Sequence, residues 1–241
     1  MKLKIKNLDY LCYTEAVEKQ RIHQEDWLKN GYAPKGFYLK DFCLIKKGDE
    51  FHLFHIAGTP GVSCCLSGNE LWFGHATTKN FVNWETHEPC FYININSWDS
   101  GHVFAPYVIQ ALGKYWLFYT GVTNENNQRI GAAVSDDLFY WQRISNKPLI
   151  RPEEYPWAYC PTEEGAPCRD PHVCRWGNQY SLYYTAVTKE GKGCIARASS
   201  KNLLDWTDQG PVFISHKLIH PESSNVQQLK SKYLLFFWRP L

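Results

Sequence analysis

Three acidic residues stand at comparable places in a chain that repeats one pattern of strands. Asp41, Asp170 and Glu222 lie just before or at the start of a predicted inner strand, and Ala105-Pro106 holds that place in the second unit. Each carboxylate alone could merely cap a turn. If the inner strands run alongside one axis in the same sense, however, equivalent positions meet at one mouth of a channel.

Carboxylates that meet in this way suit the cleavage of a glycosidic bond. Like charges at close range disfavour joint ionisation, so that one group stays protonated while another is charged. The charged group attacks the anomeric carbon or activates water, and the protonated group gives its proton to the leaving oxygen. A third carboxylate can hold sugar hydroxyls and tune the pKa of the acid. These residue types therefore indicate a glycosidase site assembled from distant parts of the chain.

The strands that would position these carboxylates recur four times. Aromatic and β-branched runs start at positions 51, 115, 180 and 233, which are 64, 65 and 53 residues apart. Three units also contain a second segment with a small polar start and a closing tryptophan, at 78–84, 135–141 and 200–206. Each unit thus predicts four short antiparallel strands, which is the architecture of a propeller blade. We predict an all-β propeller with four recognisable blades, the last one incomplete.

The composition and charge of the chain argue against two classes of binding partner, nucleic acids and membranes. The net charge is +2 with acidic and basic residues interspersed, so we expect no nucleic-acid partner. No apolar run reaches the length of about 18 residues that a membrane span needs, so we expect no membrane partner. Nine cysteines and a charged N-terminus without an apolar signal segment favour a reducing compartment, and we expect a cytoplasmic protein.

Two regions follow from the pattern along the chain. Residues 1–36 are predicted to be an N-terminal extension with a helix at 14–29, and residues 37–241 the propeller domain. We expect neither a metal nor an organic cofactor, because Cys160, Cys168, Cys174 and His172 lack the paired spacing that is typical of zinc sites.

Two inserts between units are predicted to form walls of the binding site. Residues 93–101 and 151–167 are rich in polar and aromatic residues. Loops on one rim of a propeller surround the entrance to its central channel, so these inserts could contact a substrate there. Plain surface loops are the alternative, and a core position satisfied by backbone groups is the alternative for each histidine. The candidate substrate-binding residues are Arg169, His102, Trp98, Asp99, His75 and Trp157.

Local motifs add a resemblance to known enzymes. Residues 72–85 contain tryptophan, Gly-His-Ala, a polar turn and a closing Trp-Glu, residues 168–172 contain Arg-Asp-Pro, and residues 104–106 read Phe-Ala-Pro. On these motifs the region 38–238 resembles the five-bladed propeller glycoside hydrolases of families 43 and 32.

The resemblance implies a five-bladed propeller fold and a role for each carboxylate. Asp41 would be the nucleophile or general base, Asp170 the transition-state stabiliser and Glu222 the general acid, while Arg169 would hold sugar hydroxyls. The expected function is hydrolysis of short oligosaccharides or glycosides, including furanosides. Two alternatives stay open, namely a carbohydrate-binding propeller without turnover, and a transglycosylase or phosphorylase of the same fold.

The last predicted strand of the fourth unit has no further strand beside it. Only three residues follow the aromatic strand at 233–238, so this strand would be an exposed apolar edge. Such an edge is a template for pairing with another strand. We therefore expect a chain that is either a truncated gene product or one completed by association, with a second copy or the N-terminal helix covering the open side.

Overall fold

The computed structural model describes residues 31–159, 167–216, 220–230 and 232–238, so the helix predicted at 14–29 lies outside the described residues. These residues form three four-stranded antiparallel sheets and one two-stranded sheet. The first sheet contains β1 (Tyr38–Lys47), β2 (Glu50–Gly58), β3 (Trp72–Thr78) and β4 (Trp84–Tyr92). The second contains β5 (His102–Ala111), β6 (Lys114–Val122), β7 (Gln128–Ser135) and β8 (Gln142–Arg143).

The third and fourth sheets continue the same order. The third contains β9 (Arg169–Trp176), β10 (Gln179–Val187), β11 (Gly193–Ser200) and β12 (Thr207–Ile214), and the fourth pairs β13 (Glu222–Leu229) with β14 (Lys232–Trp238). A single 3₁₀ turn, η1 (Pro152–Glu154), is the one helical element in the part of the chain that is described. In each sheet the strands follow sequence order, as in a propeller blade.

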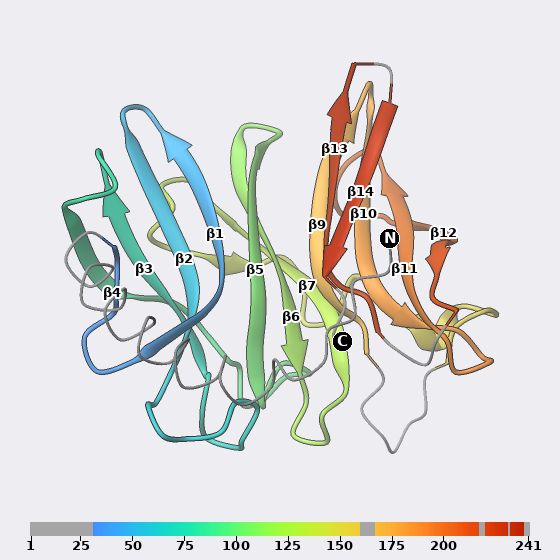
Figure 1. The fold of residues 1–241 in the computed structure, drawn as a ribbon, viewed down its shortest axis with the longest axis horizontal. Coiled ribbons are helices and arrows are strands. Elements are labelled where there is room, and N and C mark those ends of the chain that lie inside the picture. The colour runs from blue at the N-terminus through green and yellow to red at the C-terminus, as the bar shows by residue number, and fades with distance from the viewer. Residues whose placement is uncertain (1–30, 160–166, 217–219, 231, 239–241) are drawn as a thin grey trace, which may run out of the picture.

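The first strands of the four sheets stand next to one another. β1 contacts β5, β5 contacts β9, and β9 contacts β13. In Figure 1 the first sheet lies at the left and the third at the right, with β5 of the second sheet between them. The structure thus confirms the predicted all-β propeller architecture. The predicted aromatic runs are β2, β6, β10 and β14.

The repeated segment that ends in tryptophan forms a turn between the third and fourth strands. The hydroxyls of Thr78, Ser135 and Ser200 accept the backbone N–H three residues later at 2.8–2.9 Å. The residues that donate these bonds, at 81, 138 and 203, all have φ between 59° and 77°. A small polar residue is needed at the first position because its short side chain reaches back to the turn.

The hydrophobic core lies between neighbouring sheets. One cluster joins the first and second sheets and includes Phe54, Phe73 and Leu117, while another joins the second and third and includes Phe118 and Leu182. All five side chains are fully buried. Because both faces of the middle sheet are covered, its central strand β6 is buried from Tyr115 onward.

Candidate active site

A left-handed backbone residue interrupts the first strand of every sheet. Asp41, Ala105, Asp170 and Ser223 have φ of 36°, 48°, 59° and 53°. The pairing register shifts at the same place in each sheet. Such bulges redirect a side chain out of the regular ladder and are common beside active sites. Two of the four positions carry the predicted carboxylates.

The bulges also correct the sequence alignment of the fourth unit. Ser223, not Glu222, matches Asp41 and Asp170, because Glu222 comes one residue before the bulge, as Arg169 does in the third sheet. The shared register predicted for the three carboxylates is therefore wrong by one residue for Glu222. A one-residue shift turns a strand side chain toward the other face, so Glu222 approaches from a different direction.

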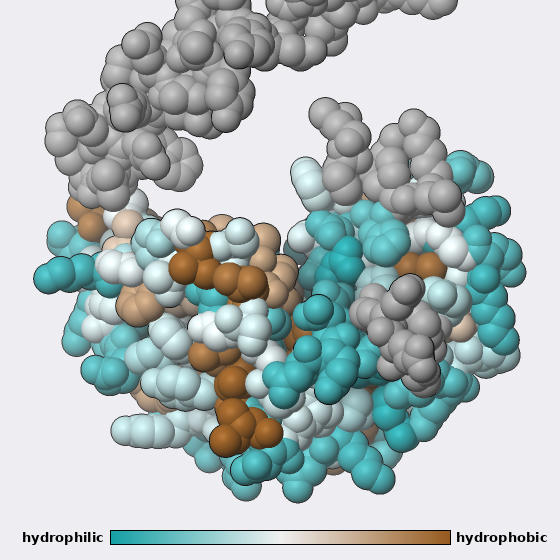
Figure 2. Space-filling view, turned by 90° about the horizontal axis from the view of Figure 1, so that it is seen from below, coloured by the Kyte–Doolittle hydropathy of each residue, from teal (hydrophilic) through white to brown (hydrophobic). Residues whose placement is uncertain are grey.

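A pocket of about 340 Å³ lies among the four bulges. Asp41 and Asp170 line it together with residues 42, 105–107, 171, 172 and 223–225. These residues belong to β1, β5, β9 and β13, the first strands of the four sheets in Figure 1, and Figure 2 shows the molecule turned by 90° and seen from below. That face is mostly polar, with apolar residues gathered in a strip on one side of its centre.

Glu222 stands at the side of this pocket and is held by a neighbouring cation. Arg169 Nη2 donates to Glu222 Oε1 at 2.5 Å, and Arg169 Nη1 donates to Gln128 Oε1 at 3.2 Å. The backbone N–H of Ser223 donates to Asp170 Oδ2 at 2.8 Å. The third and fourth sheets are thus linked through Arg169, Asp170 and Glu222, which are residues of the predicted active site.

The pocket changes the ionisation of its carboxyl groups. Burial raises the pKa of Asp170 to about 6, while the N–H of Ser223 and the charge of Arg169 oppose that rise. The pKa of Asp41 is raised as well, chiefly by desolvation, although Asp41 itself reaches solvent. Raised and mutually coupled carboxyl pKa values are typical of acid-base sites.

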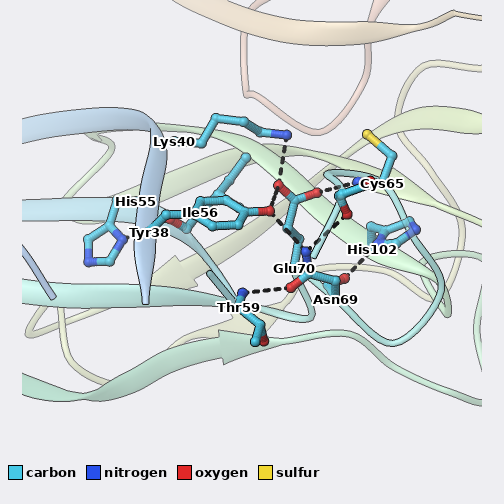
Figure 3. Close-up of polar contacts among 10 residues, drawn as sticks. Tyr38, Lys40, His55, Ile56, Thr59, Cys65, Asn69, Glu70 and His102 are labelled. Carbon is cyan, nitrogen blue, oxygen red and sulfur yellow. Dashed lines mark hydrogen bonds and ion pairs between the residues drawn. The ribbon is translucent and has the colours of Figure 1, made fainter. Parts of the chain in front are cut away.

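A buried network that the sequence did not reveal supports the residue before Asp41. The carboxylate of Glu70 accepts from Lys40 Nζ at 2.9 Å, from Tyr38 Oη at 2.8 Å and from the backbone N–H of Cys65 at 2.8 Å. Figure 3 shows these side chains converging on Glu70. Burial opposes ionisation of Glu70, but the bonds from Lys40, Cys65 and Tyr38 outweigh it and lower the pKa. No motif in the sequence marks Glu70.

Of the predicted rim residues, Asp99 lies in the core, and Trp98 is partly buried against it. Asp99 is fully buried and accepts from Arg143 Nε at 2.8 Å and from Tyr119 Oη at 3.0 Å. Trp98 stacks on Tyr119 with 5.8 Å between ring centroids. Both side chains thus pack between sheets and neither lines the pocket, so this geometry gives no support to their predicted role in sugar binding.

Two predicted histidines are also packing residues. His102 pairs through Nδ1 with the carbonyl of Asn69 at 2.8 Å and stacks on Phe104. His75 stacks on Phe54 and lies 3.0 Å from His52 Nδ1 through its Nε2. Neither lines the pocket, and both are at most 3% exposed. The alternative of a core histidine satisfied by a backbone group describes His102, whereas His75 is a core histidine paired with the His52 side chain, and its Nδ1 has no hydrogen-bond partner among the described residues.

Trp157 is likewise engaged away from the carboxylates. Its Nε1 donates to Asp208 Oδ2 at 2.8 Å, and its ring stacks on Tyr155. Arg169 is thus the one predicted substrate-binding residue that the structure brings beside the carboxylates. Within the described ranges, no three His, Cys, Asp or Glu side chains are grouped to hold a metal ion, and no helix there could cross a membrane.

A comparison with protein families decides the relationship. The family described as the glycosyl hydrolases family 32 N-terminal domain matches residues 32–237. The chain belongs to this family. Its bulged inner strands are therefore those of a family 32 propeller, as the local motifs indicated.

Three relatives of this family 32 chain illustrate the similarity. An insoluble β-fructofuranosidase isoenzyme of Arabidopsis thaliana is 25% identical over 194 residues, which are 75% of this chain and 28% of that protein. A mutant β-fructofuranosidase of Bombyx mori, solved in complex with sucrose, has a TM-score of 0.68 at 16% identity, covering 96% of this chain and 48% of that one. Fructan 1-exohydrolase IIa of Cichorium intybus has a TM-score of 0.67 at 18% identity, covering 81% and 36%. This chain thus spans less than half the length of each.

Proposed function

We propose that this chain is a glycoside hydrolase that acts on β-fructofuranosides such as sucrose. One observation carries the proposal: Asp41 and Asp170 line the same pocket on left-handed bulges, with Glu222 held beside them by Arg169. Membership of family 32 and the names of the relatives support the furanoside substrate.

The proposed roles follow from charge and position. Asp41 acts as nucleophile or general base at the anomeric carbon, and Glu222 gives its proton to the leaving oxygen. Asp170 lines the pocket, with its Oδ2 3.9 Å from Arg169 Nε, and stabilises positive charge on the sugar ring. The guanidinium of Arg169 donates to sugar hydroxyls, since it offers several N–H groups in a fixed plane. Neither a metal nor an organic cofactor has a step in this scheme.

The test measures release of glucose from sucrose by the purified chain. Asp41→Asn and Glu222→Gln should each reduce kcat by at least about a hundredfold, because an amide neither attacks nor donates the required proton. Glu85→Gln is the matched control, because Glu85 is 77% exposed on the outer strand β4. Full turnover by Asp41→Asn or Glu222→Gln would refute the assigned roles.

A second candidate function is sugar binding without turnover. It is favoured by the 2.5 Å contact of Arg169 Nη2 with Glu222 Oε1, since that oxygen is then occupied and not free to face a leaving group. Calorimetric binding of sucrose to a chain that releases no glucose would support this candidate. Transfer of fructose to an added alcohol or phosphate would instead identify the transglycosylase or phosphorylase alternative.

We also propose that the edge of β14 associates with another polypeptide segment, such as one from a second copy of the chain. Tyr233, Phe236 and Trp238 are each more than half exposed on this strand. Sedimentation at several concentrations tests this, and a monomer throughout would refute self-association.

A cytoplasmic location also stays a proposal, resting on the cysteine content, and cell fractionation tests it.

A further inference from the structure

Two buried threonines connect the second strand of one sheet to the backbone beside the acidic residue that lies at or just before the bulge of the next sheet. Thr120 of β6 and Thr185 of β10 are fully buried. They hold equivalent positions, since Thr120 pairs with Phe104 and Thr185 with Arg169, each the residue just before the bulge of its own sheet. Both hydroxyls nevertheless bond outside their own sheet.

Each hydroxyl contacts the backbone beside one proposed catalytic carboxylate. Thr120 Oγ1 accepts from the backbone N–H of Asp170 at 3.1 Å. Thr185 Oγ1 donates to the carbonyl of Pro221, the residue before Glu222, at 2.7 Å. At a bulge the backbone groups leave the regular ladder, so an outside partner decides how the bulge is held.

The first sheet supplies an internal comparison. Ile56 pairs with Lys40 and therefore stands where Thr120 and Thr185 stand in the second and third sheets. The following sheet, the second, has Ala105 at its bulge and no carboxylate there. A hydroxyl is thus present where the next bulge region carries an acidic residue, and an apolar side chain where it does not.

We propose that Thr120 and Thr185 are positioning residues that aim Asp170 and Glu222 from the preceding sheet. This rests on the proposed function, because the roles of the two carboxylates come from it. A hydroxyl in the packed interior fixes the bulge in one orientation, whereas a methyl group of the same size leaves its backbone partner unbonded. Displacement of a catalytic group by about 1 Å can cost on the order of a hundredfold in rate.

The variants are Thr120→Val and Thr185→Val, which keep the side-chain shape, and Thr120→Ser and Thr185→Ser, which keep the hydroxyl. Ile56→Val is the matched control at the equivalent position. We expect each valine variant to lower kcat on sucrose about ten- to a hundredfold with KM nearly unchanged. Each serine variant should recover most of the rate, and Ile56→Val should retain it.

A second readout does not depend on turnover. Hydrogen exchange at the Asp170 amide should be about five- to tenfold faster in Thr120→Val, and close to that of the original chain in Thr120→Ser. The carboxyl ¹³C resonance of Asp170 should move in Thr120→Val and stay in Ile56→Val. An unchanged amide and an unmoved resonance would overturn the proposal, as would full kcat in both valine variants. If the original chain hydrolyses no sucrose, the proposed function fails, while exchange and resonance still decide whether Thr120 aims Asp170.

Discussion

The histidine cluster between the first and second sheets predicts a loss of stability in acid. His75 is 1% exposed, and burial, followed by the charges of His87, His52 and His55, lowers its pKa from 6.5 to about 3. The charge of Asp137 raises the pKa of His75, but this effect is smaller than each of the effects that lower it. The folded chain therefore keeps His75 neutral at pH values where the unfolded chain binds a proton.

The sign and size follow from this difference. The contribution of His75 is complete above the unfolded pKa of 6.5 and is lost as the pH falls toward about 3. Each pH unit in that window costs about 1.4 kcal/mol, so a fall from about pH 7 to about pH 4.5 removes roughly 2.5 kcal/mol. This is a large part of the 5–15 kcal/mol that is typical of a folded domain.

The assay is urea unfolding of the original chain and of His75→Gln at several pH values. The variant cannot titrate at this position, so its stability should fall by roughly 2.5 kcal/mol less over the same range. His75→Phe is the control, because its ring can also stack on Phe54 and does not titrate. Both variants should flatten the pH dependence, whatever their stability at neutral pH. Curves parallel to that of the original chain would refute the reasoning.

Three further predictions concern other buried charges. Arg143→Met leaves Asp99 buried without its cation, so unfolding should require about 3–5 kcal/mol less, and a loss below about 1 kcal/mol in urea unfolding would contradict this. Glu70→Gln removes the ion pair with Lys40 and should lower the free energy of unfolding by about 1–3 kcal/mol, whereas Glu85→Gln on the exposed strand should change it little. Asp170→Asn should raise the stability at neutral pH by up to about 3 kcal/mol, because an acid whose folded pKa is raised to about 6 loses stability as the pH rises from about 4 to 6; equal stabilities at pH 7 would exclude that cost.

The fold could be predicted from the sequence because the chain repeats one pattern of strands and turns. Four aromatic runs and three segments ending in tryptophan predicted the sheets, because the same turn chemistry recurs at Thr78, Ser135 and Ser200. The positions of Asp41 and Asp170 followed from the same spacing. His75 was placed wrongly because both faces of a blade are buried against neighbours, so alternation does not show which side chains face the channel. Asp99 was placed wrongly for another reason: it lies in the insert 93–101, which was taken for a rim loop, but its side chain is buried between sheets.

The one-residue offset of Glu222 shows a limit of a different kind. A bulge adds a residue that only backbone angles reveal, and the sequence around Ser223 contains no glycine to mark its left-handed conformation. The signal for the threonines was present, since the sixth residue of the aromatic runs is threonine at 120 and 185 and isoleucine at 56.

The repeat and the chemistry make opposite demands on this chain. Four equivalent bulges would give four equivalent side chains, but a site that cleaves a glycosidic bond needs groups that differ in protonation. The chain departs from its own repeat at the bulges, with alanine in the second sheet and an acidic residue one step early in the fourth. Arg169 then occupies, in the third sheet, the position that Glu222 occupies in the fourth, and the two pair across the boundary at 2.5 Å. The asymmetry is thus built from neighbouring repeats, so exchanging Arg169 and Glu222 should keep their pairing but move the proposed acid to the other sheet.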